Sequence, residues 1–310
     1  MRSIILIDMG GPQTISEYKF FLNNMFFDRH IIPAPKLIRF LLSKYITYKR
    51  LKKGWENYQL IGGTPLKNSM NSLLNKVETI IDNSKDKISI AYSYVTPRIN
   101  EVLKENYDKG IRDFTLISLY PHQCYCTTSS VRYDIGSFLK NKARCTVKIF
   151  DNFYRNEFFI AFWIKMIKNE INSNSMISPH LLFSAHSIPE SIISKFNDKY
   201  DYHINQSAQL IATKLGLKHS VSYQSQIKGQ KWLEPTTSST ILNLKKNNID
   251  EIIIIPISFL NENLETLYDI DLKLIQFAKN NGVKKISRAK ITTSDENIIK
   301  MIMGFINDKI

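Results

Sequence analysis

The feature that most constrains the fold is a repeated alternation between short apolar runs and longer stretches of helical periodicity. The first four runs have the length of strands and are rich in β-branched and aromatic residues; they span 3–8, 88–95, 114–119 and 146–150. Helical patterns occupy the intervals, over 16–27, 66–81, 99–106 and 130–139. An alternation of this kind is typical of a parallel sheet with helices on both faces.

A second series with the same alternation begins after position 151. Its predicted strands span 180–184, 220–224, 252–257 and 285–291, and its predicted helices span 204–215, 237–246, 264–279 and 296–307. We therefore predict an α/β protein of two Rossmann-like lobes, each a parallel sheet flanked by helices, with a cleft between them. We expect the first lobe over 1–151, the second over 152–285, and a last strand and helix over 286–310.

The composition allows a large core and favours an anionic partner. At 310 residues, of which 43% are hydrophobic, the chain is long and apolar enough for two α/β domains of ordinary size. Its net charge of +14 suits an anionic partner such as an acidic lipid. Lysine is abundant throughout, so compositional bias explains the same excess equally well. No nucleic-acid-binding motif is present, and we expect no nucleic-acid partner.

The cysteines and the apolar runs indicate a compartment. Three cysteines, Cys124, Cys126 and Cys145, are too few and of the wrong parity for a disulfide framework, and they fit a reducing cytosol. Cys124 and Cys126 are one residue closer than paired metal ligands usually are, so we interpret them as small buried residues. The N-terminal apolar run is too short for a signal peptide, and no run approaches the roughly 20 apolar residues of a membrane span. We expect a cytoplasmic protein.

Two segments carry the residues best suited to chemistry. His186 follows the predicted strand 180–184, which places it at the carboxyl edge where open α/β sheets bind ligands. A row of acids follows the predicted strand 252–257. Glu265 and Asp269 are four residues apart and share a helix face, whereas Asp271 points elsewhere unless a π-bulge turns it. A solvated acidic face and a metal path opposite an imidazole both fit this pattern.

The same segments resemble a known family. LLFSAHSIPE, YQSQIKGQKWLEPTT and FLNENLETLYDID resemble the three signature segments of ferrochelatases, in the same order and at the usual separations. ILIDMGGPQT, FLNNMFFD, IGGTPL and LYPHQCYCTTSS extend the resemblance over nearly the whole chain. It implies a class II chelatase-like fold, with the C-terminal helix packed back on the first lobe. It also implies insertion of Fe²⁺ into protoporphyrin IX or coproporphyrin III at the end of haem biosynthesis, with release of two protons.

The resemblance implies roles for individual residues. His186 is implied to be the proton acceptor or an iron ligand; the sequence leaves this choice open, because histidine ordinarily titrates near working pH and also binds metals. Glu265 is implied to share both roles, Asp269 to be an outer iron ligand and Asp271 a weaker one. The residues implied to bind the porphyrin are Tyr120, Thr127, Thr128, Ser129, Ser130, Trp232 and Lys228. Fe²⁺ is then a substrate, and we expect no permanently bound cofactor.

Several positions depart from the ferrochelatase pattern. Asn263 stands where the family usually has histidine, and we interpret it as a helix cap in preference to a participant in proton transfer. Lys273 stands where an acid is common, which shortens the acidic ridge. The loop 61–66 is one residue shorter than in the family. Some ferrochelatases add a C-terminal tail with iron–sulfur cysteines; since this sequence ends at Ile310 without one, we expect no iron–sulfur cluster.

The segment 35–55 combines an apolar helical stripe with a run of cations. Apolar residues recur at helical spacing from Leu37 to Ile46, and seven lysines and arginines occur with no acid until Glu56. One interpretation is a helix packed on its own domain with a solvated polar face. The other, which the resemblance favours, is a porphyrin lip over about 26–66 whose apolar face meets porphyrin or lipid. With such a lip we expect a monomer in peripheral contact with an anionic membrane, at the inner face of the cell membrane.

Two other functions fit parts of the sequence. Asn263 and Lys273 suggest a porphyrin- or metal-binding relative that lacks turnover. A cobalt chelatase of related fold, acting on another tetrapyrrole, is a further alternative. Such proteins are generally shorter and richer in histidine, and the segments WLEPTT and LETLYDID speak against this alternative. The ferrochelatase function is the leading hypothesis.

Overall fold

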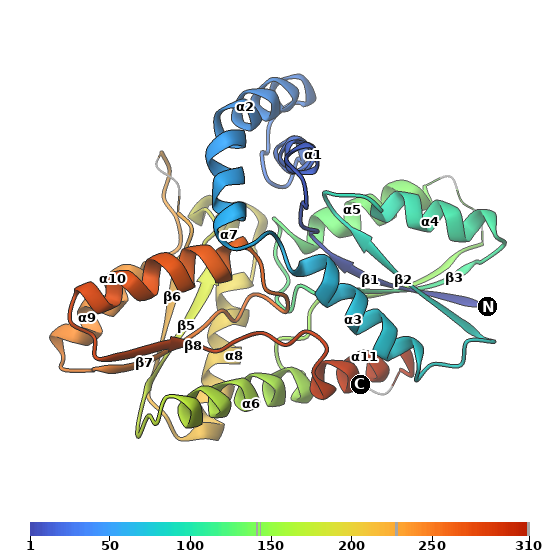
Figure 1. The fold of residues 1–310 in the computed structure, drawn as a ribbon. Helices are drawn as coiled ribbons and strands as arrows, with labels where there is room; N and C mark the ends of the chain where they lie inside the picture. Colours follow the sequence, from blue (N-terminus) through green and yellow to red (C-terminus); the bar gives the residue numbers. More distant parts are fainter. Residues whose placement is uncertain (141, 143, 227–228, 309–310) are drawn as a thin grey trace. The chain divides into compact units, whose positions relative to one another are not determined.

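A computed structural model of the chain describes residues 1–140, 142, 144–226 and 229–308 (Figure 1). Within these residues the strands form two four-stranded sheets, and every pairing between neighbouring strands is parallel. The predicted α/β class with two parallel sheets is confirmed. The chain divides into two compact units: the first comprises Met1–Tyr120, Cys124–Asp151 and the chain from Ile299 onward, and the second comprises Pro121–Gln123 and Asn152–Ile298.

The sheet of the first unit has the strand order β2-β1-β3-β4. Its strands are β1 (Arg2–Asp8), β2 (Asp86–Tyr92), β3 (Asp113–Ser118) and β4 (Thr146–Phe150). β1 is buried along its length after Arg2, and its run of isoleucine and leucine suits a strand that helices cover on both faces. The register pairs Ile4 of β1 with Ile88 on one side and with Thr115 on the other.

Helices cover both faces of this sheet. They are α1 (Ile15–Phe27), α2 (Lys36–Leu60), α3 (Leu66–Glu78), α4 (Ile99–Asp108), α5 (Thr128–Leu139) and the greater part of α11 (Glu296–Ile306). Ile5 and Ile7 of β1 share one apolar core with α4 and α5, and α3 and α11 lie on the opposite side of the sheet (Figure 1). In α11 the ring of Phe305 stacks on Phe150 of β4, with ring centroids 4.8 Å apart.

α1 and α2 lie against each other and pack through aromatic rings. The rings of Tyr18 and Tyr58 meet edge to face, with centroids 5.2 Å apart. A side chain at Gly54 would place its Cβ atom 2.0 Å from the Tyr18 hydroxyl, so the close approach of the two helices requires glycine there. Only Ser43, Thr47 and Tyr58 of α2 are buried, so most of this 25-residue helix is accessible to solvent.

The sheet of the second unit has the strand order β6-β5-β7-β8. Its strands are β5 (His180–His186), β6 (His219–Gln224), β7 (Glu251–Ile255) and β8 (Lys285–Arg288). Its helices are α6 (Glu157–Ser173), α7 (Glu190–Phe196), α8 (Tyr200–Leu215), α9 (Thr237–Lys246), η1 (Glu265–Leu274) and α10 (Ile275–Asn280). Leu182, Ile252 and Ile254 form an apolar core with α9, η1 and α10.

Two differences from the sequence predictions bear on the site. β5 continues two residues further than predicted, so His186 is the last residue of the strand and not part of the turn after it. The predicted α-helix over 264–279 is instead largely the π-helix η1, followed by α10. At the junction the N–H of Ile275 donates to the carbonyl of Ile270, five residues earlier, as π-helical geometry requires. Hydrophobic periodicity over so short a segment does not separate the two helix types.

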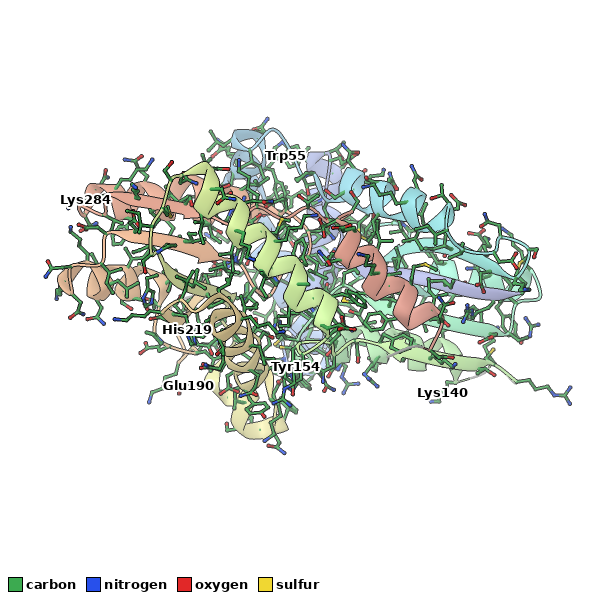
Figure 2. All side chains as sticks on the ribbon, turned by 90° about the horizontal axis from the view of Figure 1, so that it is seen from below. Trp55, Lys140, Tyr154, Glu190, His219 and Lys284 are labelled. Atoms are coloured by element: carbon green, nitrogen blue, oxygen red, sulfur yellow. The ribbon has the colours of Figure 1, made fainter. Side chains whose placement is uncertain are left out.

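Positive charge is spread over both units. Lys140 of the first unit and Lys284 of the second both project into solvent (Figure 2). Some of this charge is paired locally, as where Lys284 contacts Asp250 at 2.8 Å. The net charge of +14 is therefore not the property of a single patch. In the described part of the chain, no helix is long and apolar enough to cross a bilayer.

Candidate active site

Three neighbouring segments of the second unit fix the backbone of His186. In the sheet, His186 pairs with Gln224, the last residue of β6. Its N–H donates to the hydroxyl of Ser258 at 3.2 Å, and its carbonyl accepts from the hydroxyl of Tyr200 at 3.0 Å. The imidazole therefore projects from a rigid strand end, with 39% of the side chain exposed.

Glu265, the first residue of η1, lies beside this imidazole. Its Oε1 atom is 3.4 Å from Nε2 of His186. Its Oε2 atom and Nε2 of Gln224 are both buried without a hydrogen bond of ordinary geometry among the described residues, but the Gln224 amide is close enough to lower the pKa of the Glu265 carboxyl. Burial raises the pKa of the Glu265 carboxyl above its usual range, and this effect outweighs the opposing effect of His186. The structure thus brings together the two residues that the sequence analysis ranked first.

This pair has the properties of a proton-accepting site. A carboxyl with a raised pKa exchanges protons nearer neutral pH than an ordinary glutamate does, and a histidine within reach provides a second acceptor. Imidazole nitrogen and carboxylate oxygen are also ordinary ligands of divalent first-row metals. Buried polar atoms without partners are unusual in proteins and are often found at functional sites. The arrangement therefore suits both proton removal and transient metal contact.

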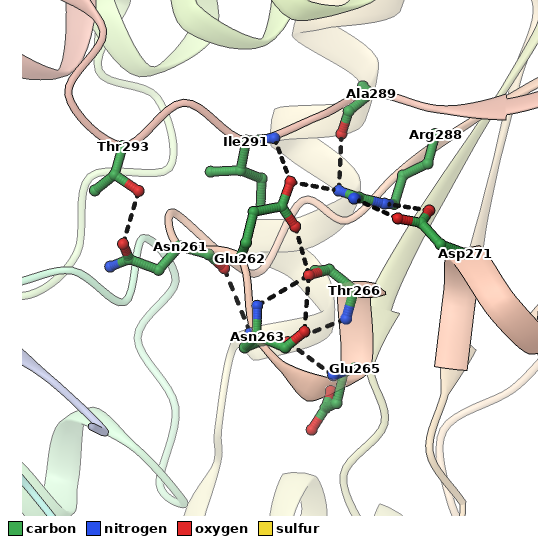
Figure 3. Close-up of polar contacts among 10 residues, drawn as sticks. All are labelled: Asn261, Glu262, Asn263, Glu265, Thr266, Asp271, Arg288, Ala289, Ile291 and Thr293. Atoms are coloured by element: carbon green, nitrogen blue, oxygen red, sulfur yellow. Dashed lines mark hydrogen bonds and ion pairs between the residues drawn. The ribbon is translucent and has the colours of Figure 1, made fainter. Parts of the chain in front are cut away.

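Asn263 determines where the helix with Glu265 begins (Figure 3). Its side-chain oxygen accepts from the N–H groups of Glu265 at 2.9 Å and Thr266 at 3.1 Å. In return, the hydroxyl of Thr266 accepts from the Asn263 N–H at 3.0 Å. This reciprocal arrangement is a capping box with threonine in place of the more frequent glutamate. Asn263 therefore caps the helix, as predicted, and orients the residue that carries the carboxylate.

An ion cluster around the buried Arg288 also holds η1, and it was not predicted from the sequence. The Arg288 side chain, at the end of β8, is only 2% exposed and donates two hydrogen bonds of 2.8 Å to the two carboxylate oxygens of Asp271. Its Nη1 atom lies 2.9 Å from Oε1 of Glu262. Glu262 in turn accepts from the Thr266 hydroxyl at 2.5 Å (Figure 3). Arg288 is a cation in a short strand whose other residues we expected to be buried. This was the only feature of the sequence that pointed to the cluster.

The cluster decides the position of Asp271. Both of its carboxylate oxygens are engaged by Arg288, so the π-helix does not turn this side chain into the His186–Glu265 pair. From the sequence, Asp271 was a weak candidate ligand. The contacts give it a structural role, since releasing it would leave the buried guanidinium with one acid partner fewer.

Asp269 lines a cavity of about 340 Å³ in the second unit. The other lining residues are mostly polar: Tyr223, Gln224, Ser225, Gln226, Thr236, Thr237, Ser238 and Leu274. Gln224 thus joins this cavity to the His186–Glu265 pair, because it also neighbours His186 in the sheet. Asp269 contacts Lys273 at 3.2 Å, and Oγ of Ser225 is buried without a hydrogen-bond partner in the described structure. Among the described residues, no three His, Cys, Asp or Glu side chains are grouped to hold a metal.

The other predicted porphyrin contacts lie in separate places. Trp232 forms an antiparallel bridge with Pro189, three residues after His186, which brings the tryptophan segment to the histidine turn. Lys228 lies outside the described residues. In the first unit the remaining five, Tyr120, Thr127, Thr128, Ser129 and Ser130, lie between the end of β3 and the first turn of α5.

Two hydroxyls of this first-unit segment have internal partners. The Thr128 hydroxyl donates to the carbonyl of Cys124 at 3.0 Å, which fixes the loop before α5. The Ser130 hydroxyl donates to the Asp28 carboxylate. Thr127 and Ser129 are half-buried. Thr128 and Ser130 therefore fix the loop before α5, whereas Thr127 and Ser129 leave polar groups accessible near the start of that helix.

Solved structures share this fold across almost the whole chain. SirB from Bacillus subtilis, in a structure with Fe³⁺, matches with a TM-score of 0.62 at 9% sequence identity, covering 99% of this chain and 95% of that one. CbiX, described as the terminal enzyme for siroheme biosynthesis in denitrifying bacteria, matches with a TM-score of 0.53 at 10% identity and covers all of both chains. The fold is that of the class II chelatases.

Sequence comparison identifies the family within this class. The model of the ferrochelatase family matches residues 1–310. The ferrochelatase of Wolbachia pipientis wMel is 34% identical over 284 residues, covering 88% of this chain and 89% of that protein. The ferrochelatase of a Nitratiruptor species is 30% identical over 309 residues, covering 98% of both. The chain belongs to the ferrochelatase family and is a metal chelatase, a lyase; the resemblance found in its motifs is confirmed.

Proposed function

We propose that the chain inserts Fe²⁺ into protoporphyrin IX or coproporphyrin III, releasing two protons, at the end of haem biosynthesis. The observation that carries the proposal is the 3.4 Å contact between Nε2 of His186 and Oε1 of Glu265. A free-base porphyrin has two pyrrole N–H groups, and both protons leave as iron forms bonds to the four nitrogens. A histidine and a glutamate with raised pKa supply two acceptors at one place.

The two acceptors have different tasks in this proposal. His186, more exposed and held at a strand end, accepts the first pyrrole proton. Glu265 takes the second and passes it to solvent, because its raised pKa lets it bind a proton reversibly near neutral pH. The amide of Gln224 stabilises the charged form of the Glu265 carboxyl and lowers its pKa, against the larger effect of burial. Neither of the two proton transfers requires a site at which the metal has lost all of its water ligands.

We further propose that iron arrives through the polar cavity. Asp269 provides an oxygen ligand at its wall, and the hydroxyls and amides beside it exchange readily with the water ligands of a hydrated ferrous ion. Asp271 is left out of this route because Arg288 engages both of its oxygens. The proposed porphyrin contacts are Trp232 in the second unit, Tyr120, Thr127, Thr128, Ser129 and Ser130 in the first, and Lys228, which lies outside the described residues.

The proposal extends to the place where the enzyme works. The exposed cations and apolar side chains of α2 support peripheral contact with an anionic membrane. A cytoplasmic enzyme at the inner face of the cell membrane would meet sparingly soluble porphyrin there. We propose a monomer, since one chain carries both acceptors.

The test is insertion by a His186→Ala variant in the absence of oxygen, with Fe²⁺ and each of the two porphyrins. We expect the rate to fall at least about 100-fold, the lower end of the usual contribution of a general base, while circular dichroism stays that of the wild type. His219→Asn is the matched control, because it removes an imidazole from the amino end of β6 in the same sheet. Near-normal turnover by a folded His186→Ala variant would place the reaction elsewhere.

A further inference from the structure

The first unit contains a second cavity, of about 610 Å³, around the beginning of α2. Its lining is basic and aromatic: Arg29, Lys36, Arg39, Tyr125 and Tyr133, with Pro33, Ala34 and Pro35. We propose that this cavity binds the phosphate of an anionic phospholipid headgroup. The inference rests on the membrane contact proposed above and assigns it a specific site.

The charge of the cavity matches a phosphate. No acid of the described structure forms an ion pair with Arg29, Lys36 or Arg39. Arg39 is already oriented, because Nε donates to the carbonyl of Phe27 at 3.0 Å and Nη1 to that of Ala34 at 2.7 Å. Its remaining guanidinium edge is then fixed in place for an anion, and guanidinium groups favour phosphate for the geometry of their donors.

The start of α2 adds backbone donors to the same place. Pro35 precedes the helix and provides no side-chain cap, and the first turn contains no acid. The N–H groups of this turn therefore lack the partner that a cap would supply. A 25-residue helix presents the positive end of its dipole here, which favours a bound phosphate.

The aromatic wall of the cavity is held by the buried histidine behind it. The ring of His30 lies 4.9 Å from that of Tyr125 and 5.6 Å from that of Tyr133, measured between centroids. Nδ1 of His30 is 3.1 Å from the Asp28 carboxylate, which fixes the imidazole. The guanidinium of Arg29 lies over Tyr133, 5.3 Å from the ring centroid. These ring contacts orient Arg29, Tyr125 and Tyr133, although Arg29, Lys36 and Tyr133 are exposed.

The apolar surface of α2 indicates a lipid and not free phosphate. Leu37, Leu41, Tyr45 and Tyr48 follow one another at helical spacing and are 71%, 61%, 60% and 80% exposed. This stripe begins one residue after Lys36, at the same end of α2 as the cavity, and lies on a different face of the helix from Lys36 and Arg39. A phosphate in the cavity would sit at headgroup depth while the stripe lies at the acyl boundary, as in interfacial amphipathic helices.

Short-chain lipids below their micelle-forming concentration test the cavity without a membrane surface. Calorimetric titration of the full chain with dihexanoyl phosphatidylglycerol should show saturable binding to one site. Arg29→Gln with Lys36→Gln should weaken that binding at least tenfold. Lys67→Gln with Lys140→Gln, which removes the same charge from exposed positions of the first unit, should leave it unchanged. Inorganic phosphate should compete, but with a Kd at least tenfold higher than that of the lipid.

Three results would overturn the proposal. One is equal weakening by the two double variants, which would show a general charge effect. Another is tighter binding of inorganic phosphate than of the lipid. A third is stoichiometric displacement of the lipid by a soluble porphyrin, which would make the cavity a porphyrin carboxylate site.

Vesicles of phosphatidylglycerol and phosphatidylcholine separate this proposal from the membrane contact on which it rests. We expect flotation with these vesicles to be lost when Arg29 and Lys36 are both changed to glutamine. Retention by this variant, together with loss on neutralising Lys49, Arg50, Lys52 and Lys53, would reject the cavity and keep the membrane contact. Loss of neither would reject both. Iron insertion with detergent-solubilised porphyrin is measured in parallel, so a failure of the catalytic proposal is visible on its own.

Discussion

Glu265 shows at the scale of a single residue how the site opposes folding stability. Its side chain is 26% exposed, but one carboxyl oxygen is buried without a hydrogen bond of ordinary geometry in the described structure, and burial raises its pKa. In the unfolded chain a glutamate loses its proton near pH 4.3. The folded state holds the proton to higher pH, so the free energy of unfolding falls as pH rises through the raised pKa. The penalty is absent below the unfolded-state pKa and complete above the folded-state pKa.

Glu265→Gln should therefore separate stability from activity. At neutral pH we expect the variant to have a higher Tm than the wild type, because the amide carries no charge to bury. At pH 4 the difference should disappear. Insertion should fall about 10²–10⁴-fold, the usual contribution of a general acid or base. The Tm is measured by thermal unfolding at the two pH values, and the rate of Fe²⁺ insertion is measured in an anaerobic assay.

Asp269→Asn is the control for this experiment. Its carboxylate lines the cavity and contacts an exposed lysine, so saturating iron should restore most of its activity. Equal losses in the two variants at saturating iron would contradict the separate tasks proposed for them.

The capping residue Asn263 gives a second test at the residue scale. Asn263→His removes the oxygen that accepts from Glu265 and Thr266, and loss of such a cap typically costs about 1 kcal/mol. We expect a lower Tm and an unchanged rate–pH profile. A new ionisation between roughly pH 5 and 8 in the profile would instead show that position 263 takes part in proton transfer.

At the scale of elements, the π-helix η1 is the part of the site with the most specific support. The capping box fixes its first turn, and Arg288 of β8 fixes it again through Asp271. Glu265 lies between these two anchors. The carboxylate is therefore positioned relative to the sheet that carries His186 by one network, in which the Thr266–Glu262 hydrogen bond joins the cap to the Arg288 cluster.

Arg288→Met tests this positioning role. It leaves Glu262 and Asp271, which are 14% and 31% exposed, without their cation. Breaking a fully buried ion pair typically costs about 3–5 kcal/mol, and this is the upper limit for the cluster. We expect a large fall in Tm, and a fall in kcat with a KM for porphyrin close to that of the wild type. Arg288→Lys should recover part of the stability and less of the activity, since an ammonium cannot bond both oxygens of Asp271 in the same way.

Asp271→Asn decides between the two roles considered for that residue. If Asp271 only anchors η1, the variant loses stability and its KM for iron stays that of the wild type. A raised KM for iron with an unchanged Tm would instead identify Asp271 as a ligand.

At the scale of the whole molecule, the end of the chain returns to the unit in which the chain began. Arg2 of β1 donates to the carbonyl of Ile306 at 2.7 Å, and Phe305 stacks on Phe150. The two ends of the sequence therefore belong to one compact unit, with most of the second unit between them in sequence. Contacts of such long sequence separation form late or cooperatively, because the loop that they close is long.

Phe305→Ala tests the importance of this return. Phe305 is 2% exposed, and truncating a buried phenylalanine typically costs about 3–5 kcal/mol. We expect the first unit to unfold at lower denaturant concentration, as followed by near-ultraviolet circular dichroism. Met303→Ala, at a half-buried position of the same helix, is the control and should cost less. Equal costs would mean that the helix, and not the ring stack, supplies the stability.

The sequence by itself determined the class of fold and the family, and it led us to propose the two residues at the centre of the candidate site. Buried parallel strands need apolar runs, and the crossovers between them need amphipathic helices. The two sheets could therefore be predicted from the local sequence pattern. His186 and Glu265 could be proposed as site residues because each lies within a family motif. Asn263 was also interpreted correctly, since capping depends on neighbours in sequence.

Only the tertiary structure decided how these residues are held and charged. Arg288 contacts acids 17 and 26 positions away, a separation at which local pattern carries no information. That contact engages both carboxylate oxygens of Asp271, and the π-helix that carries this residue was not distinguishable from an α-helix by periodicity. The raised pKa of Glu265 arises from burial by its surroundings, and burial is a property of the packed chain and not of any segment of it.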